Sequence, residues 1–203
     1  MKHIRSLTLV FVFLLCTVTG SWAAPITFTD VSATGSYHGG LDPLTDGVLP
    51  AEGTQWSKSS TWWNTTTPVF TFTFDESLIE EITLSVDNND DYVIQYRNGD
   101  TDWATLVAID ADDGNVNAHN PGGQDTMSSD ASLGDAIYMP TLDFSPVVAT
   151  QIRIFAVGGD NSYSIGEVQL SGTPVTAAVP EPASLALLGV GLLGLAGYAR
   201  RRF

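Results

Sequence analysis

The sequence is poor in cysteine and histidine, and it lacks the short motifs of several enzyme classes. Its single cysteine, Cys16, lies in an apolar segment near the start, so no disulfide framework can stabilise the remainder of the chain. Neither His38 nor His119 stands in a metal-ligand spacing, which argues against a zinc site. A Gly-x-Ser-x-Gly turn and a phosphate-binding loop are both missing. We therefore predict a protein that is not an enzyme.

Basic residues are scarce outside the two ends of the chain. The stretch from Ala24 to Val179 keeps only Lys58, Arg97 and Arg153, against 22 of the 23 acidic residues, a formal charge of −19. Such a surface repels nucleic acid, whose recognition needs a basic footprint, and it also repels anionic lipid headgroups. It suits solubility outside the cell and the binding of divalent cations.

Residues 1–23 have the three parts of a secretory signal peptide. Lys2 and Arg5 form a basic start, and an apolar run follows over residues 7–18. Ser21 and Ala23 supply the small residues of a cleavage site after Ala23. The apolar run is too short to be read first as a membrane span. We expect this segment to direct export and to be removed.

An uncharged apolar run dominates the other end of the chain. It covers residues 183–199 and is followed by three arginines, Arg200, Arg201 and Arg202. Seventeen helical residues span about 25 Å, slightly less than a hydrocarbon core of ~30 Å. We predict a transmembrane helix at 183–199, with the arginines on the cytoplasmic side of the inner membrane by the positive-inside rule.

The motif Pro180, Glu181, Pro182 stands directly before this run. Pro-Glu-Pro, an apolar helix and terminal arginines, in that order, resemble the PEP-CTERM sorting signal over residues 179–203. The resemblance implies export in a Gram-negative bacterium and recognition by an exosortase-type membrane protease, which would remove the anchor near the motif. The protein would then be anchored in the inner membrane only in transit, before it reaches the cell envelope or the extracellular matrix.

Between the two ends, residues 24–172 predict one all-β domain, and residues 173–178 form a linker. Phenylalanine and threonine alternate over residues 69–74, the period expected of a strand with one buried face. Polar turns rich in Asp and Asn separate the candidate strands, and we see no amphipathic helix. The predicted strands cover residues 69–74, 82–86, 92–96, 103–109, 152–157 and 165–170. This pattern is typical of an antiparallel β-sandwich or jelly roll, with a long surface excursion expected over residues 110–135.

Three places in this domain, in order, resemble discoidin-type, galactose-binding-like domains. They are Leu44-Thr45-Asp46-Gly47 with Thr54-Gln55-Trp56-Ser57, the hairpin from Tyr92 to Trp103, and the closing pair at residues 150–154 and 165–172. The first loop is longer than is usual in that family, and Asn98 replaces the usual Asp of the hairpin turn.

The resemblance implies an eight-stranded antiparallel jelly roll with a structural calcium ion beside the first loop. Asp46 and Thr54 would be ligands from that loop, and Glu167 would reach the ion from the last strand. Calcium takes six to eight oxygen ligands, including backbone carbonyls, and suits a loop that can wrap around it. The alternative, that Asp46 only starts a turn and Glu167 is solvated, stays open.

Two further acidic segments fail the spacing of an EF-hand calcium loop. Glycine comes one position early in residues 110–114, and in residues 87–92 Tyr92 stands where the glycine belongs. We expect both segments to be solvated turns.

Aromatic residues supply a candidate glycan-binding surface. Trp62 and Trp63 are adjacent, so in a strand their side chains face opposite sides and one of them can be exposed. The candidate set is Tyr37, His38, Trp62, Trp63 and Tyr163. Partial burial of these side chains is an open alternative, and by the resemblance Trp56 and Trp103 match positions that pack in the family core.

The sequence thus predicts a non-catalytic, exported or surface-anchored module that binds extracellular polysaccharide or a matrix glycan. The main alternative is a structural protein of the extracellular matrix or envelope with no discrete ligand. A glycan-active enzyme is the least favoured reading, since acidic residues are too abundant for a catalytic carboxylate pair to be recognised.

Overall fold

The computed structural model describes residues 23–110, 122–130 and 141–175. The apolar run of the predicted signal peptide and the sorting signal with its helix at 183–199 lie outside these residues. Within the described ranges, no helix is long and apolar enough to cross a membrane.

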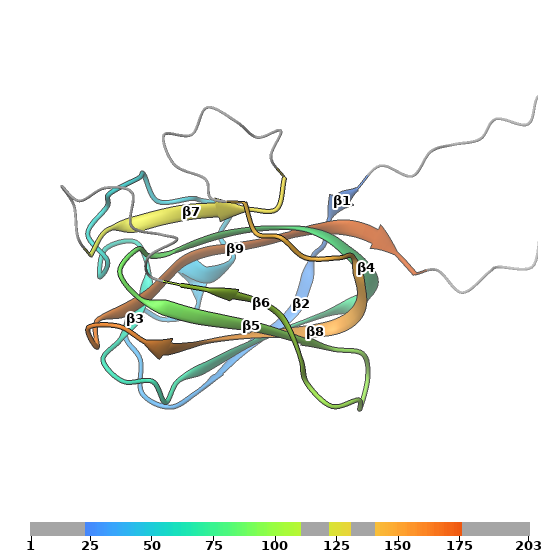
Figure 1. Ribbon diagram of the computed structural model, residues 1–203, viewed down its shortest axis with the longest axis horizontal. Helices are drawn as coiled ribbons and strands as arrows, with labels where there is room; N and C mark the ends of the chain where they lie inside the picture. Colours follow the sequence, from blue (N-terminus) through green and yellow to red (C-terminus); the bar gives the residue numbers. More distant parts are fainter. Residues whose placement is uncertain (1–22, 111–121, 131–140, 176–203) are drawn as a thin grey trace, which may run out of the picture.

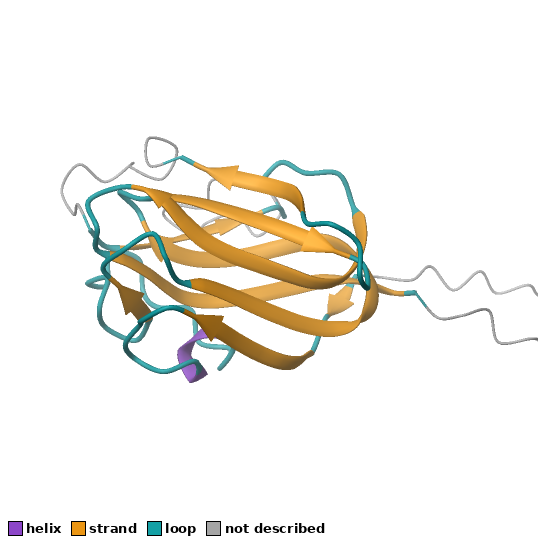
Figure 2. Cartoon of the chain, turned by 90° about the horizontal axis from the view of Figure 1, so that it is seen from below, coloured by secondary structure: helices purple, strands orange, loops and turns teal. Residues whose placement is uncertain are grey.

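The described domain is all-β, as predicted, and its nine strands pair antiparallel (Figures 1 and 2). One helical turn, η1, lies at the edge of the domain at Asp42–Leu44. The strands are β1 Ala24–Pro25, β2 Phe28–Thr34, β3 Thr61–Trp63, β4 Val69–Asp87, β5 Asp91–Arg97, β6 Ala104–Ile109, β7 Gln124–Ser128, β8 Val147–Gly158 and β9 Tyr163–Pro174.

Strand β4 connects the two layers of the sandwich. Its first half pairs with β2 and β8, and its second half pairs with β9 and β7. Residues 69–74 and 82–86, predicted as two strands, are therefore one strand of 19 residues. The register with β8 shifts between Thr73 and Ser77, and such an irregularity lets a strand bend from one layer into the other.

The core lies between the layers and follows the alternation in the sequence. Phe70, Phe72 and Phe74 are buried, while the threonines between them are partly exposed. Full burial of one such side chain contributes about 1.5–3 kcal/mol to folding. The same inward face continues through Ile152 and Ile154 of β8 and Val168 and Leu170 of β9.

Strand β7 corrects the prediction of one long surface excursion over residues 110–135. All five of its residues are buried, and it pairs with the end of β4. Its sequence, Gln-Asp-Thr-Met-Ser, has no apolar alternation that could have indicated a strand. The burial comes from a distant loop: Gly53 N–H donates to Gln124 O (2.9 Å), and Gln124 N–H donates to Thr54 O (2.8 Å).

The first and last described strands lie side by side. β1 pairs with the end of β9, where Ala24 opposes Gly172. Figure 1 shows this pair at one end of the domain and β3 at the other. A surface at β3 therefore faces away from the point where the chain enters and leaves the domain.

Candidate functional site

The first loop brings two of the three predicted calcium ligands together. Glu167 of β9 is 1% exposed, and its two carboxylate oxygens accept the Gly47 N–H at 3.2 and 3.3 Å. The Gln169 amide donates to the same carboxylate at 3.3 Å. The neighbouring Asp46 carboxylate accepts the Val48 N–H at 2.8 Å and so shapes the loop.

The charges of this pair fit a cation. Burial raises the pKa of Glu167, and the adjacent Asp46 carboxyl raises it further, whereas the Gly47 N–H and the Gln169 amide lower it. Two carboxylates close together repel each other, and an ion bound between them relieves this repulsion. Calcium at this pair stays a prediction.

The third predicted ligand, Thr54, lies further along the same loop. Its hydroxyl donates to Ala51 O at 2.5 Å, and no hydrogen bond in the described part of the chain joins it to Asp46 or Glu167. Over the described ranges, no three or more His, Cys, Asp or Glu side chains form a ready-made metal group. Calcium at this loop would need backbone carbonyls and water besides the two carboxylates, and the ligand set stays a prediction.

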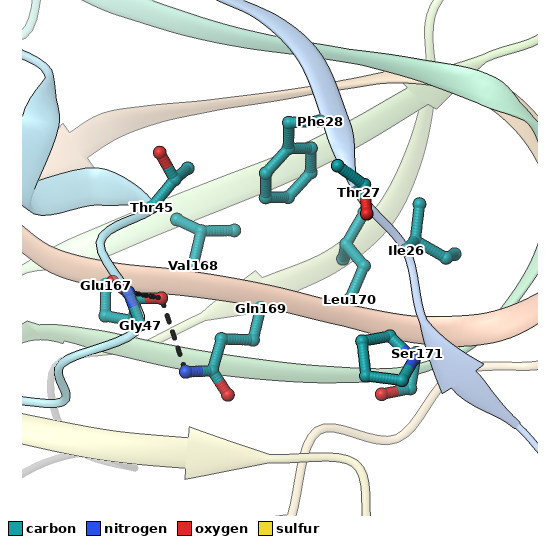
Figure 3. Close-up of a pocket in the computed structure, with 11 residues that line it drawn as sticks. Ile26, Thr27, Phe28, Thr45, Gly47, Glu167, Val168, Gln169, Leu170 and Ser171 are labelled. Carbon is teal, nitrogen blue, oxygen red and sulfur yellow. Dashed lines mark hydrogen bonds between the residues drawn. The ribbon is translucent and has the colours of Figure 1, made fainter.

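A groove of about 460 Å³ opens beside Glu167 (Figure 3). Its floor is residues 167–171 of β9, with Thr45 and Gly47 on one side and residues 25–28 on the other. Ile26, Phe28 and Leu170 give it an apolar part, and Glu167 and Gln169 a polar one.

A second group of side chains, the aromatic cluster, consists of His38, Trp56 and Trp62. The rings of His38 and Trp62 stack with centroids 4.1 Å apart and planes at 24°. Trp56 meets Trp62 edge-on at 5.1 Å and 88°. His38 is exposed and both tryptophans are half-buried, so all three residues keep part of their surface in contact with solvent.

Backbone contacts hold this cluster in place. His38 and Trp62 exchange backbone hydrogen bonds of 2.8 and 3.1 Å. The next residue, Gly39, has φ +84°, and a Cβ there would lie 2.3 Å from Ser60 O, so only glycine fits. The Ser60 hydroxyl in turn donates to Trp56 O. Hydrogen bonds and close packing of the backbone therefore fix the positions of the rings.

The structure corrects part of the predicted glycan set. Trp63 is fully buried and Tyr163 is 1% exposed, so neither can stack on a sugar at the surface. The reason is strand parity: Trp62 faces outward in β3, and Trp63, which pairs with Tyr163 of β9, faces inward. Tyr37 is half-buried against Phe70 at 5.5 Å.

Trp56 and Trp103, which were expected in the core, are only half-buried. Trp103 lies against the guanidinium groups of Arg97 and Arg153, at 4.6 and 4.4 Å from its ring centroid. Trp56 joins the aromatic cluster and was missed as a binding residue. Its polar neighbours Gln55, Ser57 and Lys58 could have indicated a surface position.

Comparison with solved structures finds bacterial proteins that are similar at low TM-scores. CpGH89CBM32-6 of Clostridium perfringens is 19% identical, with a TM-score of 0.41 over 70% of this chain and 92% of that one. An F5/8 type C domain of Bacteroides fragilis is 17% identical, with a TM-score of 0.38 over 75% and 98%. A Ruminococcus gnavus GH29 fucosidase is 14% identical, with a TM-score of 0.34 over 61% of this chain and 22% of the enzyme.

These neighbours are of the kind that the sequence motifs resemble, but TM-scores this low identify no shared binding site. No curated protein sequence matches the chain. One family does match: the PEP-CTERM protein-sorting motif, over residues 178–202. The chain thus carries a PEP-CTERM sorting signal, which marks an exported protein that passes through a membrane-anchored step and is processed by an exosortase.

Proposed function

We propose that this protein is a non-catalytic, exported module that binds extracellular polysaccharide or a matrix glycan through the aromatic cluster. The observation that carries the proposal is the stacked, solvent-facing pair of His38 and Trp62 with Trp56 set at a right angle to it. Sugar rings have apolar C–H faces that stack on flat aromatic rings, while the ring nitrogens stay available for hydroxyl groups.

The charge of the domain favours a neutral glycan. Residues 24–179 carry a formal charge of −19, so a polysaccharide rich in carboxylate or sulfate would be repelled. Stacking on aromatic rings needs no charge on the ligand. Neutral hexose polymers therefore suit this cluster better than acidic ones.

The position of the cluster suits a tethered module. β3, which carries Trp62, lies at the end of the domain opposite the paired β1 and β9 (Figure 1). A protein held by its sorting signal would present this end to the extracellular matrix.

We propose a supporting role for calcium at Asp46 and Glu167. An ion there would tie the first loop to β9, and the same loop leads to Trp56. Its contribution would be to order the loop in advance of glycan binding, which lowers the entropic cost of association.

Replacing Trp62 with alanine is expected to weaken glycan binding at least tenfold, about 1.4 kcal/mol, because it removes the central ring of the cluster. The measurement is titration calorimetry with neutral polysaccharides selected on a glycan array. Trp103→Ala is the matched control, because Trp103 is also half-buried but lies against Arg97 and Arg153. Unchanged affinity in Trp62→Ala would remove the cluster from the site, and no saturable binding by the wild-type chain would favour a matrix protein without a discrete ligand.

Replacing Pro180, Glu181 and Pro182 with alanines is expected to hold the protein in the inner membrane, because the exosortase would no longer recognise its signal. Cell fractionation measures the distribution. A mature N-terminus at Ala24 in the retained variant would show that export itself is intact. Sorting like that of the wild-type chain would mean that the motif has no role here.

A further inference from the structure

The layer of β5 and β8 carries a basic group on its outer face, in a domain that is otherwise strongly acidic. Only three basic residues occur between Ala24 and Val179, and two of them, Arg97 and Arg153, meet at the ring of Trp103. Their guanidinium carbons lie 4.6 and 4.4 Å from the ring centroid. The face of an indole ring attracts cations, so this ring holds the two charges side by side. We call these three side chains the arginine cluster.

Neutral side chains fix the two guanidinium groups. Arg97 Nε–H donates to Gln151 Oε1, and Arg153 Nε–H donates to Gln95 Oε1 at 2.8 Å. The Gln151 amide donates in turn to the Thr73 hydroxyl at 2.9 Å, so the bonds link β4, β8 and β5. The hydrogen bonds that these groups make in the described part of the chain use Nε alone. The terminal nitrogens of both arginines are therefore left for a ligand.

The charges of the pair are not neutralised by a carboxylate within the described ranges, since both groups hydrogen-bond to glutamine. Burial lowers the pKa of Arg153, and the adjacent Arg97 guanidinium lowers it further. The acids closest in sequence, Asp100 and Asp102, are exposed in the hairpin turn, where solvent screens their charge. The pair thus keeps a mutual repulsion that a bound anion would relieve.

The buried acids of the domain lie at the other end of the same strand. Asp87 and Asp90 are each 1% exposed, so the expectation that residues 87–91 form a solvated turn is wrong. Both precede β5, whereas Arg97 ends it, and the strand between them is about 20 Å long. These acids are too distant to pair with the arginine cluster.

The hairpin turn after β5 positions Trp103 over the sheet. Gly99 N–H donates to the Thr150 hydroxyl of β8 at 2.9 Å. The Asn98 amide donates to the Glu76 carboxylate of β4 at 2.7 Å, which engages this acid with a neutral partner. The turn is therefore fixed to two strands, and the cluster is arranged before any ligand arrives.

Polar side chains continue from the cluster across the layer. In the strand pairing, Arg153 lies opposite Gln95 of β5 on one side and Thr71 of β4 on the other, and Thr71 lies opposite Ser32 of β2. All four are exposed or half-buried, because the alternate residues of these strands fill the core. Neighbouring strands are about 4.8 Å apart, so the row is about 14 Å long. Such a row suits an extended ligand with many hydroxyl groups.

We propose that the arginine cluster binds an anionic group, a carboxylate or a sulfate ester, carried by an otherwise neutral glycan. The proposal rests on the proposed function for the class of ligand, but it uses a different set of residues from the aromatic cluster. Guanidinium groups bind such oxyanions through paired N–H···O bonds. The charge of −19 still disfavours a polyanion. Screening beyond about 8 Å, however, lets the two nearby arginines decide the binding of a single anionic group.

The test compares two forms of one oligosaccharide. The first is a short chain of neutral hexoses with a single glucuronate residue, and the second is the same chain after its carboxyl group has been reduced to an alcohol. Calorimetry with the purified full-length chain should show at least about tenfold tighter binding of the acidic form, because reduction removes hydrogen bonds to a charged group. A third probe carries one sulfate ester on the reduced chain, and its affinity relative to the glucuronate form identifies the preferred anion.

Arg153→Gln should remove the preference for the acidic form and leave the affinity for the reduced form unchanged. Lys58→Gln is the matched control, because it changes the net charge equally at an exposed position outside the cluster. Trp103→Ala should reduce the preference, since the ring positions both guanidinium groups. If Arg153→Gln does not fold, Arg97→Gln takes its place.

Three results would overturn the proposal: equal affinity of the wild-type chain for all three probes, a preference that survives Arg153→Gln, or an equal loss of preference in Lys58→Gln. The last would show that only net charge matters. Trp62→Ala separates this site from the aromatic cluster, because it should leave the ratio between the acidic and reduced forms unchanged. If Trp62→Ala has no effect on any glycan while Arg153→Gln removes the preference, the proposed function of the aromatic cluster fails and the arginine site stands.

Discussion

Replacing Trp63 with alanine is expected to lower the free energy of unfolding by about 3–5 kcal/mol. At roughly 2–4 °C per kcal/mol for a chain of this size, the melting midpoint should fall by about 6–20 °C. Trp63 is fully buried and packs on Phe70 at 4.7 Å and on Tyr163 at 6.0 Å. Removing its ring leaves a large cavity between the layers, which the surrounding side chains can fill only in part.

Trp62→Ala is the matched control, because it removes the same side chain from the next position of β3. Trp62 is half-buried, so its loss should change stability by about 1 kcal/mol or less. Trp63→Phe should cost less than Trp63→Ala, since it keeps an aromatic ring and deletes the buried Trp63 Nε1–H, which has no partner. Thermal and urea unfolding measure all three variants. A larger loss of stability in Trp62→Ala than in Trp63→Ala would mean that Trp62 is the buried side chain of β3. Trp63 would then be the exposed one and the candidate for glycan binding.

The sequence predicts the parts of the fold in which the local pattern of apolar and polar residues shows which side chains are buried. Phe70, Phe72 and Phe74 alternate with threonine, and this period alone identifies a strand and its inward face. The predicted strands at 92–96, 152–157 and 165–170 are confirmed as β5, β8 and β9 for the same reason. No knowledge of the neighbouring strand is needed in such cases.

In a short strand, which side chains point outward depends instead on the strands that pair with it. Adjacent Trp62 and Trp63 are equivalent in sequence, and only the pairing with His38 on one side and β9 on the other decides which points outward. Strand β7 has no pattern of its own, and the first loop buries it. Propensity and periodicity cannot record such long-range contacts.

The buried acids were missed for a related reason. Templates for calcium loops search one short segment, and residues 87–92 fail such a template. In the structure, Asp87 and Asp125 are buried where the end of β4 pairs with β7, and these two strands are far apart in the sequence. Asp46 and Glu167 could be linked only because the family resemblance already joins the two segments.

In a calcium chelator, the stability of the protein is expected to fall as the pH rises from about 5 to about 9. Burial above all raises the pKa of Asp87 to about 8, of Asp90 to about 7 and of Asp125 to about 9. An unfolded aspartate has a pKa of about 3.9. Between these values the folded chain holds protons that the unfolded chain has released, so each rise in pH favours unfolding.

The slope of stability against pH follows from the number of extra protons that the folded chain holds. One extra proton in the folded state costs about 1.4 kcal/mol of stability per pH unit, and at least one such proton is expected between about pH 5 and pH 7. Urea unfolding at a series of pH values measures the slope. High salt screens repulsion between exposed acids but hardly affects buried ones, so a slope that survives salt belongs to the buried group.

A variant of Asp87 tests whether the pH dependence of stability belongs to these buried carboxylates. Asp87→Asn should reduce the slope in the chelator and should also be more stable than the wild-type chain there near pH 8, since the amide removes a buried charge. A wild-type stability in the chelator that is constant or rises from pH 6 to pH 8 would show that these carboxylates are already ionised and compensated, and that protons do not stabilise the folded chain.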